Sequence, residues 1–135
     1  MRLTRRISVI VLAVLALTAV GRQAAAQTQT ASEFYMAYRA AFDKATKIED
    51  LLPYMSKENS AKVASTPAKD KAQMFEMMKM MGTITNVKVA KETKTPTGAT
   101  LTVNALDSDK KPTTGKIDLI QEAGKWKIGS ESWSS

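Results

Sequence analysis

The sequence predicts an α+β domain in which N-terminal helices pack on one face of a curved, antiparallel meander of four strands. Apolar residues recur at near-helical spacing from residue 31 to residue 81, and the spacing becomes a simple alternation after Gly82. Threonine and valine replace alanine and methionine at the same point, and short links join the alternating segments. The 135 residues include 44% hydrophobic and 24% charged side chains, which is typical of a folded domain.

The residues before this domain have the plan of a secretory signal peptide. A basic start precedes an apolar run over residues 7–20, and Ala24 and Ala26 fit an A-x-A cleavage site. As a helix the run is roughly 21 Å long, which is too short for a bilayer core that takes roughly 20 residues. We therefore expect a signal peptide over residues 1–26 and an exported domain over residues 27–135, periplasmic or secreted, with no membrane span after cleavage. The alternative is an uncleaved N-terminal anchor.

Composition excludes several kinds of chemistry. The chain has no cysteine and no histidine, so it lacks disulfides, thiol nucleophiles, cysteine-bound zinc and the usual near-neutral acid–base group. Its net charge of +7 comes mostly from arginines of the expected signal peptide, and the lysines of the helical half alternate with acids. That alternation is typical of a solvated face, so nucleic-acid binding is not expected.

The first helix is expected to begin at Thr30, because Thr30-Ala-Ser-Glu33 reads as a capping box. Its apolar stripe consists of Phe34, Tyr38, Ala41, Phe42 and Ala45. The side chains expected to face away from the stripe are Arg39, Asp43 and Lys47. A second, short helix over residues 48–55, limited or bent by Pro53, leads to a turn or another short helix through Val63.

The next helix carries an unusual number of methionines. Thr66 and Pro67 read as its N-cap and first residue, it is expected to end at Met81, and Gly82 is expected to close it in a left-handed conformation. An arc of roughly 100° on the helical wheel holds Met74, Met77, Met78 and Met81. Core packing against the sheet explains such a stripe most simply. The alternatives are a groove for a ligand or partner and a Cu(I) site, since thioethers prefer soft metals.

Alternating residues then predict four strands, over residues 84–91, 99–106, 116–122 and 125–128. Gly129 is expected to form a bulge, because Trp126 and Ile128 share a parity that Trp133 does not. Trp126 alternates with lysines and is therefore expected in the core between the sheet and the helices.

Four segments carry a family resemblance: residues 32–38, 48–55 and 99–103 and, most specifically, the hairpin over residues 119–128. Together they resemble short exported bacterial domains of the nuclear-transport-factor-2-like superfamily, also called SnoaL-like or cystatin-like. The resemblance spans nearly the whole expected domain. It implies a cone-shaped scaffold that serves enzymes, ligand binders and interaction modules alike, and Trp133 would lie at the edge of the cone or in an oligomer contact.

Enzymes of that superfamily use Asp, Tyr and His groups that project into the cone, and this chain lacks the histidine. Asp118 has the parity of the solvent-facing strand positions, and Asp107 lies at a strand end. Tyr35 and Tyr38 are expected to hold their rings in the core and their hydroxyl groups near the rim. We therefore assign no catalytic residue, no metal site and no cofactor.

The sequence thus predicts an exported, non-enzymatic domain that binds a small apolar ligand or a protein partner through the cone mouth or the sheet face, with a homodimer implied by the resemblance alone. The candidate pocket residues are Phe34, Tyr38, Phe42, Met74, Met77, Met78, Met81 and Trp126. Two alternatives stay open: a cone-pocket enzyme of the isomerase or dehydratase kind, and a methionine-rich Cu(I)-binding protein.

Overall fold

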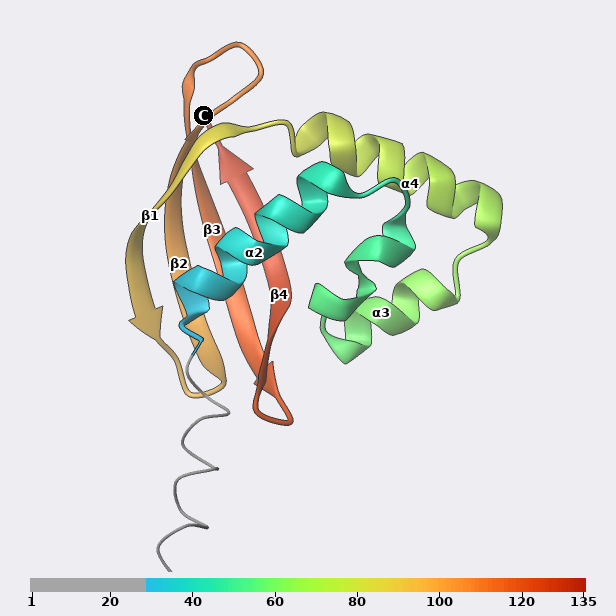
Figure 1. Ribbon diagram of the computed structural model, residues 1–135, viewed down its shortest axis with the longest axis horizontal. Coiled ribbons are helices and arrows are strands. Elements are labelled where there is room, and N and C mark those ends of the chain that lie inside the picture. The colour runs from blue at the N-terminus through green and yellow to red at the C-terminus, as the bar shows by residue number, and fades with distance from the viewer. Residues whose placement is uncertain (1–28) are drawn as a thin grey trace, which may run out of the picture.

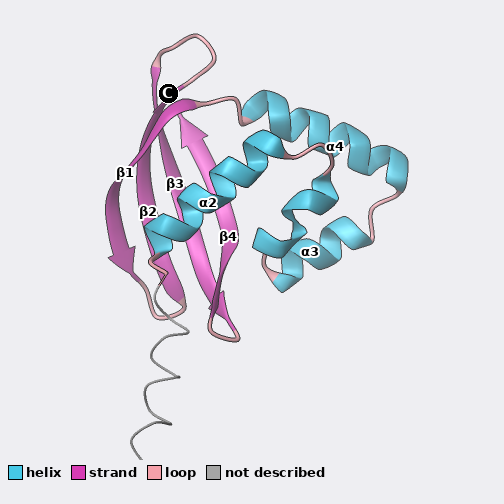
Figure 2. Ribbon diagram, viewed as in Figure 1, coloured by secondary structure: helices cyan, strands magenta, loops and turns pink. Residues whose placement is uncertain are grey.

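The computed structural model describes residues 29–135, and the expected signal peptide lies outside these residues (Figure 1). Helices come first and strands follow, in an α+β arrangement (Figure 2). The helical elements are α2 (Ala31–Lys44), the 3₁₀ helix η2 (Ile48–Tyr54), α3 (Lys57–Ala64) and α4 (Ala68–Met81). The strands are β1 (Thr85–Lys94), β2 (Gly98–Leu106), β3 (Pro112–Glu122) and β4 (Lys125–Ser134). No helix among these residues is long and apolar enough to cross a membrane.

The strands form one antiparallel sheet in the order β1-β2-β3-β4, as predicted. Ala123 and Gly124, both with positive φ, make the tight turn between β3 and β4. The bulge at Gly129 is confirmed: Asp118 pairs with Ser130, whereas the next residue, Leu119, pairs with Ile128. Because pairing resumes beyond the bulge, β4 continues well past the predicted end at residue 128, and β3 likewise begins earlier than predicted.

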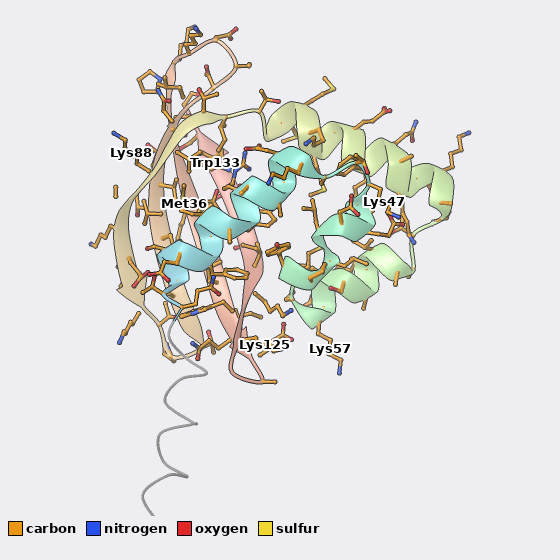
Figure 3. The ribbon with its side chains drawn as sticks, in the orientation of Figure 1. Met36, Lys47, Lys57, Lys88, Lys125 and Trp133 are labelled. Carbon is orange, nitrogen blue, oxygen red and sulfur yellow. The ribbon has the colours of Figure 1, made fainter. Side chains whose placement is uncertain are left out.

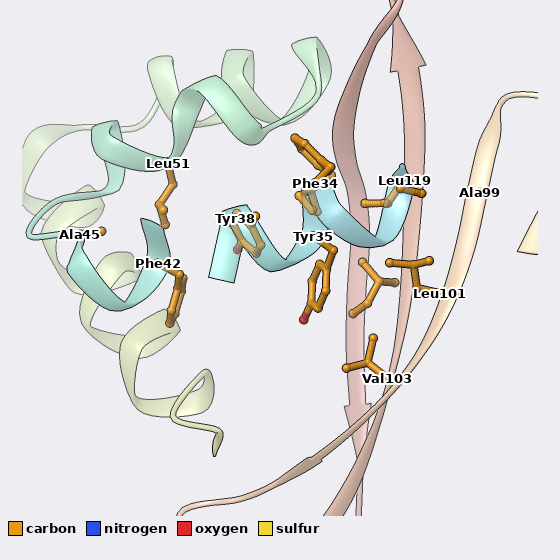
Figure 4. Close-up of a cluster of buried hydrophobic side chains, with 13 residues drawn as sticks. Phe34, Tyr35, Tyr38, Phe42, Ala45, Leu51, Ala99, Leu101, Val103 and Leu119 are labelled. Carbon is orange, nitrogen blue, oxygen red and sulfur yellow. The ribbon is translucent and has the colours of Figure 1, made fainter. Parts of the chain in front are cut away.

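Helix α2 crosses the concave face of the sheet, and η2, α3 and α4 lie beside it (Figure 1). Thr30 caps α2 as predicted, since its hydroxyl accepts a hydrogen bond of 3.1 Å from the backbone N–H of Glu33. The core is the layer between α2 and the sheet, where Tyr35, Leu101 and Val103 are completely buried (Figure 4). The helical layer therefore shields the apolar side of the sheet, which is the arrangement that the sequence predicts.

Two predictions about α4 are wrong. Its N-cap is Pro67 rather than Thr66, and no side chain caps it. Gly82 has a φ of −91°, so it is not left-handed. Glycine is required there for space instead, because a Cβ would lie 2.6 Å from the ring of Phe42. Close approach of α2 to the end of α4 explains this glycine.

The methionine face of α4 is also less buried than predicted. Met74 and Met78 are half-buried, and Met78 packs against the core together with Phe75. Met77 and Met81 are 61% and 78% exposed, so core packing does not account for them. The reason is that α4 lies at the periphery of the helical layer and touches η2 more than the sheet, which leaves its far side in solvent (Figure 1).

Candidate functional site

A groove of about 560 Å³ opens where the start of α2, the end of η2 and the β3–β4 turn meet. Its lining residues are Gln29, Phe34, Ala37, Pro53, Tyr54, Gln121, Gly124, Lys125, Trp126 and Lys127. This volume is within the range of about 300–1,000 Å³ that is usual for small-molecule sites. The groove is therefore the first candidate for a binding site among the described residues.

Aromatic rings from three different elements form the walls of the groove. Phe34 comes from the first turn of α2, and its ring centroid lies 6.0 Å from that of Tyr54 in a tilted arrangement. Trp126 comes from β4, and its indole N–H donates a 2.9 Å hydrogen bond to the backbone oxygen of Gln29. The residues just before α2 are thus held against the sheet, and the groove has a fixed edge on that side.

Lysines supply the charge of the groove. The ammonium group of Lys127 donates a 2.6 Å hydrogen bond to the backbone oxygen of Pro53, which ties β4 to η2. Lys125 is exposed at the β3–β4 turn, at the end of β4 opposite Trp133 (Figure 3). Its ammonium group forms no ion pair within residues 29–135. The groove therefore combines an aromatic wall with one cation that is available to an anionic ligand.

A second hollow, of about 630 Å³, lies on the other side of Trp126, against the turn between β1 and β2. Gln121 and Trp126 line both hollows. The two hollows are therefore adjacent, and Trp126 contributes to both.

The structure brings together only part of the predicted pocket set. Phe34 and Trp126 line the groove, and Tyr38 lies directly behind it, with its ring centroid 5.8 Å from that of Tyr54. Phe42 lies one helical turn further along, under the ammonium group of Lys79 at 4.9 Å from the ring centroid. The methionines of α4 do not line either hollow. The expected single pocket of eight residues is therefore replaced by an aromatic groove at one end and a separate methionine helix.

A buried polar cluster on the other side of α2 was not predicted. Arg39 is only 4% exposed, although the sequence pattern placed it away from the core. Its Nη2 donates a 2.7 Å hydrogen bond to the backbone oxygen of Gly82, and its Nη1 lies 3.8 Å from a carboxylate oxygen of Glu131. The same carboxylate oxygen accepts hydrogen bonds from the Trp133 indole at 2.7 Å and the Tyr35 hydroxyl at 3.3 Å.

Burial sets the protonation of the tyrosines in this cluster. It raises the pKa of Tyr35 well above the ordinary value of 10.0, and the charge of Glu131 raises it further. Burial and Glu131 raise the pKa of Tyr38 in the same way, while the guanidinium of Arg39 opposes the shift at both residues. Both phenols are thus held in the neutral form. The hydroxyl of Tyr35 is engaged by Glu131, and neither hollow reaches it.

Helical periodicity could not reveal the cluster, because Arg39 lies beside the aromatic stripe and is buried only once Gly82 and β4 close over it. The available signal was an acid, Glu131, between Trp126 and Trp133 on a strand that was predicted to end at residue 128.

Asp118 takes no part in the interior, as expected from its strand parity. Its carboxylate accepts hydrogen bonds of 2.9 Å from Thr100 and from Ser130, its neighbours across the sheet. Within residues 29–135 no group of three or more acids, the metal-ligating side chains that remain in a chain without histidine or cysteine, is gathered to hold a metal ion.

These observations define a class of protein: a small α+β domain with a packed core between helix and sheet, and with two hollows beside Trp126, one at the β3–β4 turn and one at the β1–β2 turn. The chain belongs to the family described as Domain of unknown function (DUF4878), whose model matches residues 24–129. All residues that line the groove fall inside the matched range, whereas Glu131 and Trp133 lie beyond it. Comparison with curated proteins and with solved structures found no match.

Proposed function

We propose that this protein is an exported, non-enzymatic binding domain that holds a small ligand with an apolar body and an anionic end in the groove beside Trp126. The observation that supports this proposal is the groove itself. Phe34, Tyr54 and Trp126 present aromatic surface there, and the ammonium group of Lys125, which forms no ion pair within residues 29–135, lies in the same groove. Aromatic faces bind apolar groups over a large area, and a lysine at the rim favours an anion.

The assignment to the nuclear-transport-factor-2-like superfamily is part of this proposal. A helix that crosses the concave face of a curved antiparallel sheet, followed by further helices at its side, is compatible with the cone of that superfamily (Figure 1). The closed core between α2 and the sheet favours binding at the mouth over binding deep inside. Export rests on the basic, apolar and small-residue plan of residues 1–26, which gives a periplasmic or secreted protein.

The test uses 1-anilinonaphthalene-8-sulfonate, an aromatic sulfonate whose fluorescence rises on binding. Ala37 and Ala40 are both exposed alanines of α2, but only Ala37 lines the groove. We expect Ala37→Leu to fill the groove and weaken binding about tenfold or more, and Ala40→Leu to leave it unchanged, since the two changes have the same effect on helix propensity. Equal binding by the two variants would refute the groove as the site.

Charge recognition is tested separately. Lys125 lines the groove, whereas Lys116 is exposed on β3 away from both hollows. Lys125→Gln is expected to weaken sulfonate binding and to remove most of its salt dependence, while Lys116→Gln has little effect. An uncharged naphthalene derivative is expected to bind the two variants equally.

One observation favours the enzyme alternative as a second candidate. Tyr35 is a buried phenol with a raised pKa, hydrogen-bonded to Glu131 beside Arg39, and such donors can polarise a substrate oxygen. An isomerase or dehydratase reaction at this place requires the core to open. Substrate turnover that disappears in Tyr35→Phe, a variant that keeps the ring, would replace the binding proposal with the enzymatic one.

A homodimer through the outward face of the sheet stays a prediction. Light scattering of the purified protein measures its mass directly, and a single-chain mass at high concentration would overturn the prediction.

A further inference from the structure

The solvent side of α4 carries methionines where a surface helix normally carries charged residues. Met77 is 61% exposed, and Met80 and Met81 are each 78% exposed. The one other exposed large hydrophobic side chain among residues 29–135 is Met36 on α2, at 42% (Figure 3). The exposed large apolar side chains of residues 29–135 are therefore all methionines, and most of them are on one helix.

The three exposed methionines of α4 occupy positions i, i+3 and i+4. Met77 is therefore a helix neighbour of both Met80 and Met81, about 5–6 Å from each at the Cβ atoms. Methionine has three rotatable side-chain bonds, so thioethers that start this close can turn toward a common point. The helix is ordered by its opposite face, where Phe75 and Met78 pack against the core.

The charges around these methionines suit a cation. The ammonium group of Lys79, next in sequence to Met80, is drawn to the inner side of α4, where it donates a 2.6 Å hydrogen bond to the backbone oxygen of Phe42. It also lies 4.9 Å from the centre of the Phe42 ring. Glu76 is exposed on the outer side of α4 and forms no ion pair within the described residues. The lysine is thus held away from the methionines, and a carboxylate remains beside them.

Thioether ligands select the metal. Sulfur of this kind is neutral and soft and prefers Cu(I) to Zn²⁺, Mg²⁺ or Ca²⁺, which take imidazole, thiolate or oxygen ligands. The chain has no histidine or cysteine to make a competing site. We propose that Met77, Met80 and Met81 form a Cu(I) site of three thioether ligands on the outer face of α4. The ion binds as Cu(I) and leaves as Cu(I), so no electron transfer is involved.

This set differs from the stripe that the sequence suggested. Met74 and Met78 turn toward the helical layer, and Met80 takes their place on the accessible side. The site is also separate from the groove beside Trp126, so either site can fail without the other.

The test is an anaerobic titration of the purified protein with Cu(I), in competition with a chromogenic Cu(I) chelator. Ag(I), which has the same preference for thioethers and does not change oxidation state, is followed through the methyl signals of ¹³C-labelled methionine. We expect a single Cu(I) per chain, and Ag(I) shifts confined to the signals of Met77, Met80 and Met81.

The matched variants replace methionine by leucine, which keeps apolar volume and helix propensity. The triple change Met77→Leu, Met80→Leu and Met81→Leu is expected to lower Cu(I) affinity about tenfold or more, because it removes every thioether of the site. Met36→Leu, which removes an exposed methionine elsewhere, is expected to leave the affinity unchanged. Circular dichroism checks that the triple variant is folded.

Three results would overturn the proposal: no Cu(I) retained against the chelator, retention by the folded triple variant, or Ag(I) shifts spread over all the methionines. A face that serves only to dock an apolar partner gives the first result, because such a face has no need of thioethers placed to bind Cu(I).

Discussion

Neutralising Glu131 tests whether burial or distance determines how much an ion pair contributes to the free energy of unfolding of this protein. Glu131→Gln keeps the size of the side chain and an oxygen that can accept from Trp133, but it removes the charge that faces Arg39. Arg39 is 4% exposed, the side chain of Glu131 is 18% exposed, and the guanidinium lies 3.8 Å from the carboxylate. The remaining acid near Arg39 is Asp43, at 4.0 Å and with its side chain 70% exposed, so solvent screens it.

The magnitude follows from those values. At 3.8 Å and an effective dielectric constant of about 20, two unit charges attract by about 4 kcal/mol. The hydrogen bonds that glutamine retains and the weak field of Asp43 reduce the loss, so we expect Glu131→Gln to lower the free energy of unfolding by about 2–3 kcal/mol. Breaking a buried pair costs this much because it leaves the partner charged and unsolvated.

The matched control is the ion pair between Glu58 and Lys62. Its atoms are closer, at 3.0 Å, but both side chains are exposed, 79% and 69%. Exposed pairs of this kind contribute about 0.5 kcal/mol or less, so Glu58→Gln is expected to leave the free energy of unfolding almost unchanged. Urea unfolding measured by circular dichroism gives both values from the midpoints, provided that the slopes agree. A loss for Glu131→Gln no larger than that for Glu58→Gln would refute the argument from burial.

The remaining predictions concern the tyrosines, the glycine after α4 and the cap of α2. The pKa values of Tyr35 and Tyr38 are raised in the folded chain, so the unfolded chain loses its phenolic protons first. The free energy of unfolding is therefore unaffected by these groups below about pH 10 and falls as the pH rises above that value. Tyr35→Phe is expected to move alkaline unfolding, measured by phenolate absorbance, to higher pH. Gly82→Ala forces a Cβ to within 2.6 Å of the Phe42 ring and is expected to cost about 1–3 kcal/mol in urea unfolding, whereas a change near zero would show that the ring moves freely. Thr30→Ala removes the hydroxyl that accepts from the N–H of Glu33 and is expected to cost about 1 kcal/mol, and an unchanged midpoint would mean that water replaces the cap.

Local patterns were enough to predict the architecture. Alternation identified every strand, and the parity of Ile128 against Trp133 located the bulge at Gly129 before any pairing was known. Helical periodicity likewise predicted that Phe34, Tyr38 and Phe42 lie on the buried side of α2. These features depend on one element at a time, or on the parity along a single strand, and the sequence expresses them directly.

What the sequence could not predict depends on how elements meet. Arg39 is on the polar flank of its helix, and only the approach of Gly82 and Glu131 from distant parts of the chain makes that flank an interior. The prediction for the methionine stripe of α4 was wrong in the opposite direction, because these side chains are more exposed than predicted. Periodicity identifies an apolar face but does not show how much of that face a neighbouring element covers. The groove was missed in part for the same reason: Tyr54 and Lys125 line the same groove only because η2 and the β3–β4 turn converge.

The placement of the buried cluster bears on where binding can occur. Arg39 reaches from α2 to Gly82, Glu131 ties β4 to the same helix, and Tyr35 fills the space between them. Opening the core for a ligand would separate a charge pair that is shielded from water, at a cost comparable to the whole contribution of a well-packed aromatic side chain. Hydrogen bonds to backbone oxygens hold the walls of the groove beside Trp126, and a ligand there leaves all these contacts in place. Because the interior is costly to open and the end of the domain already has space, these contacts favour the proposed site at the end of the domain over one in its centre.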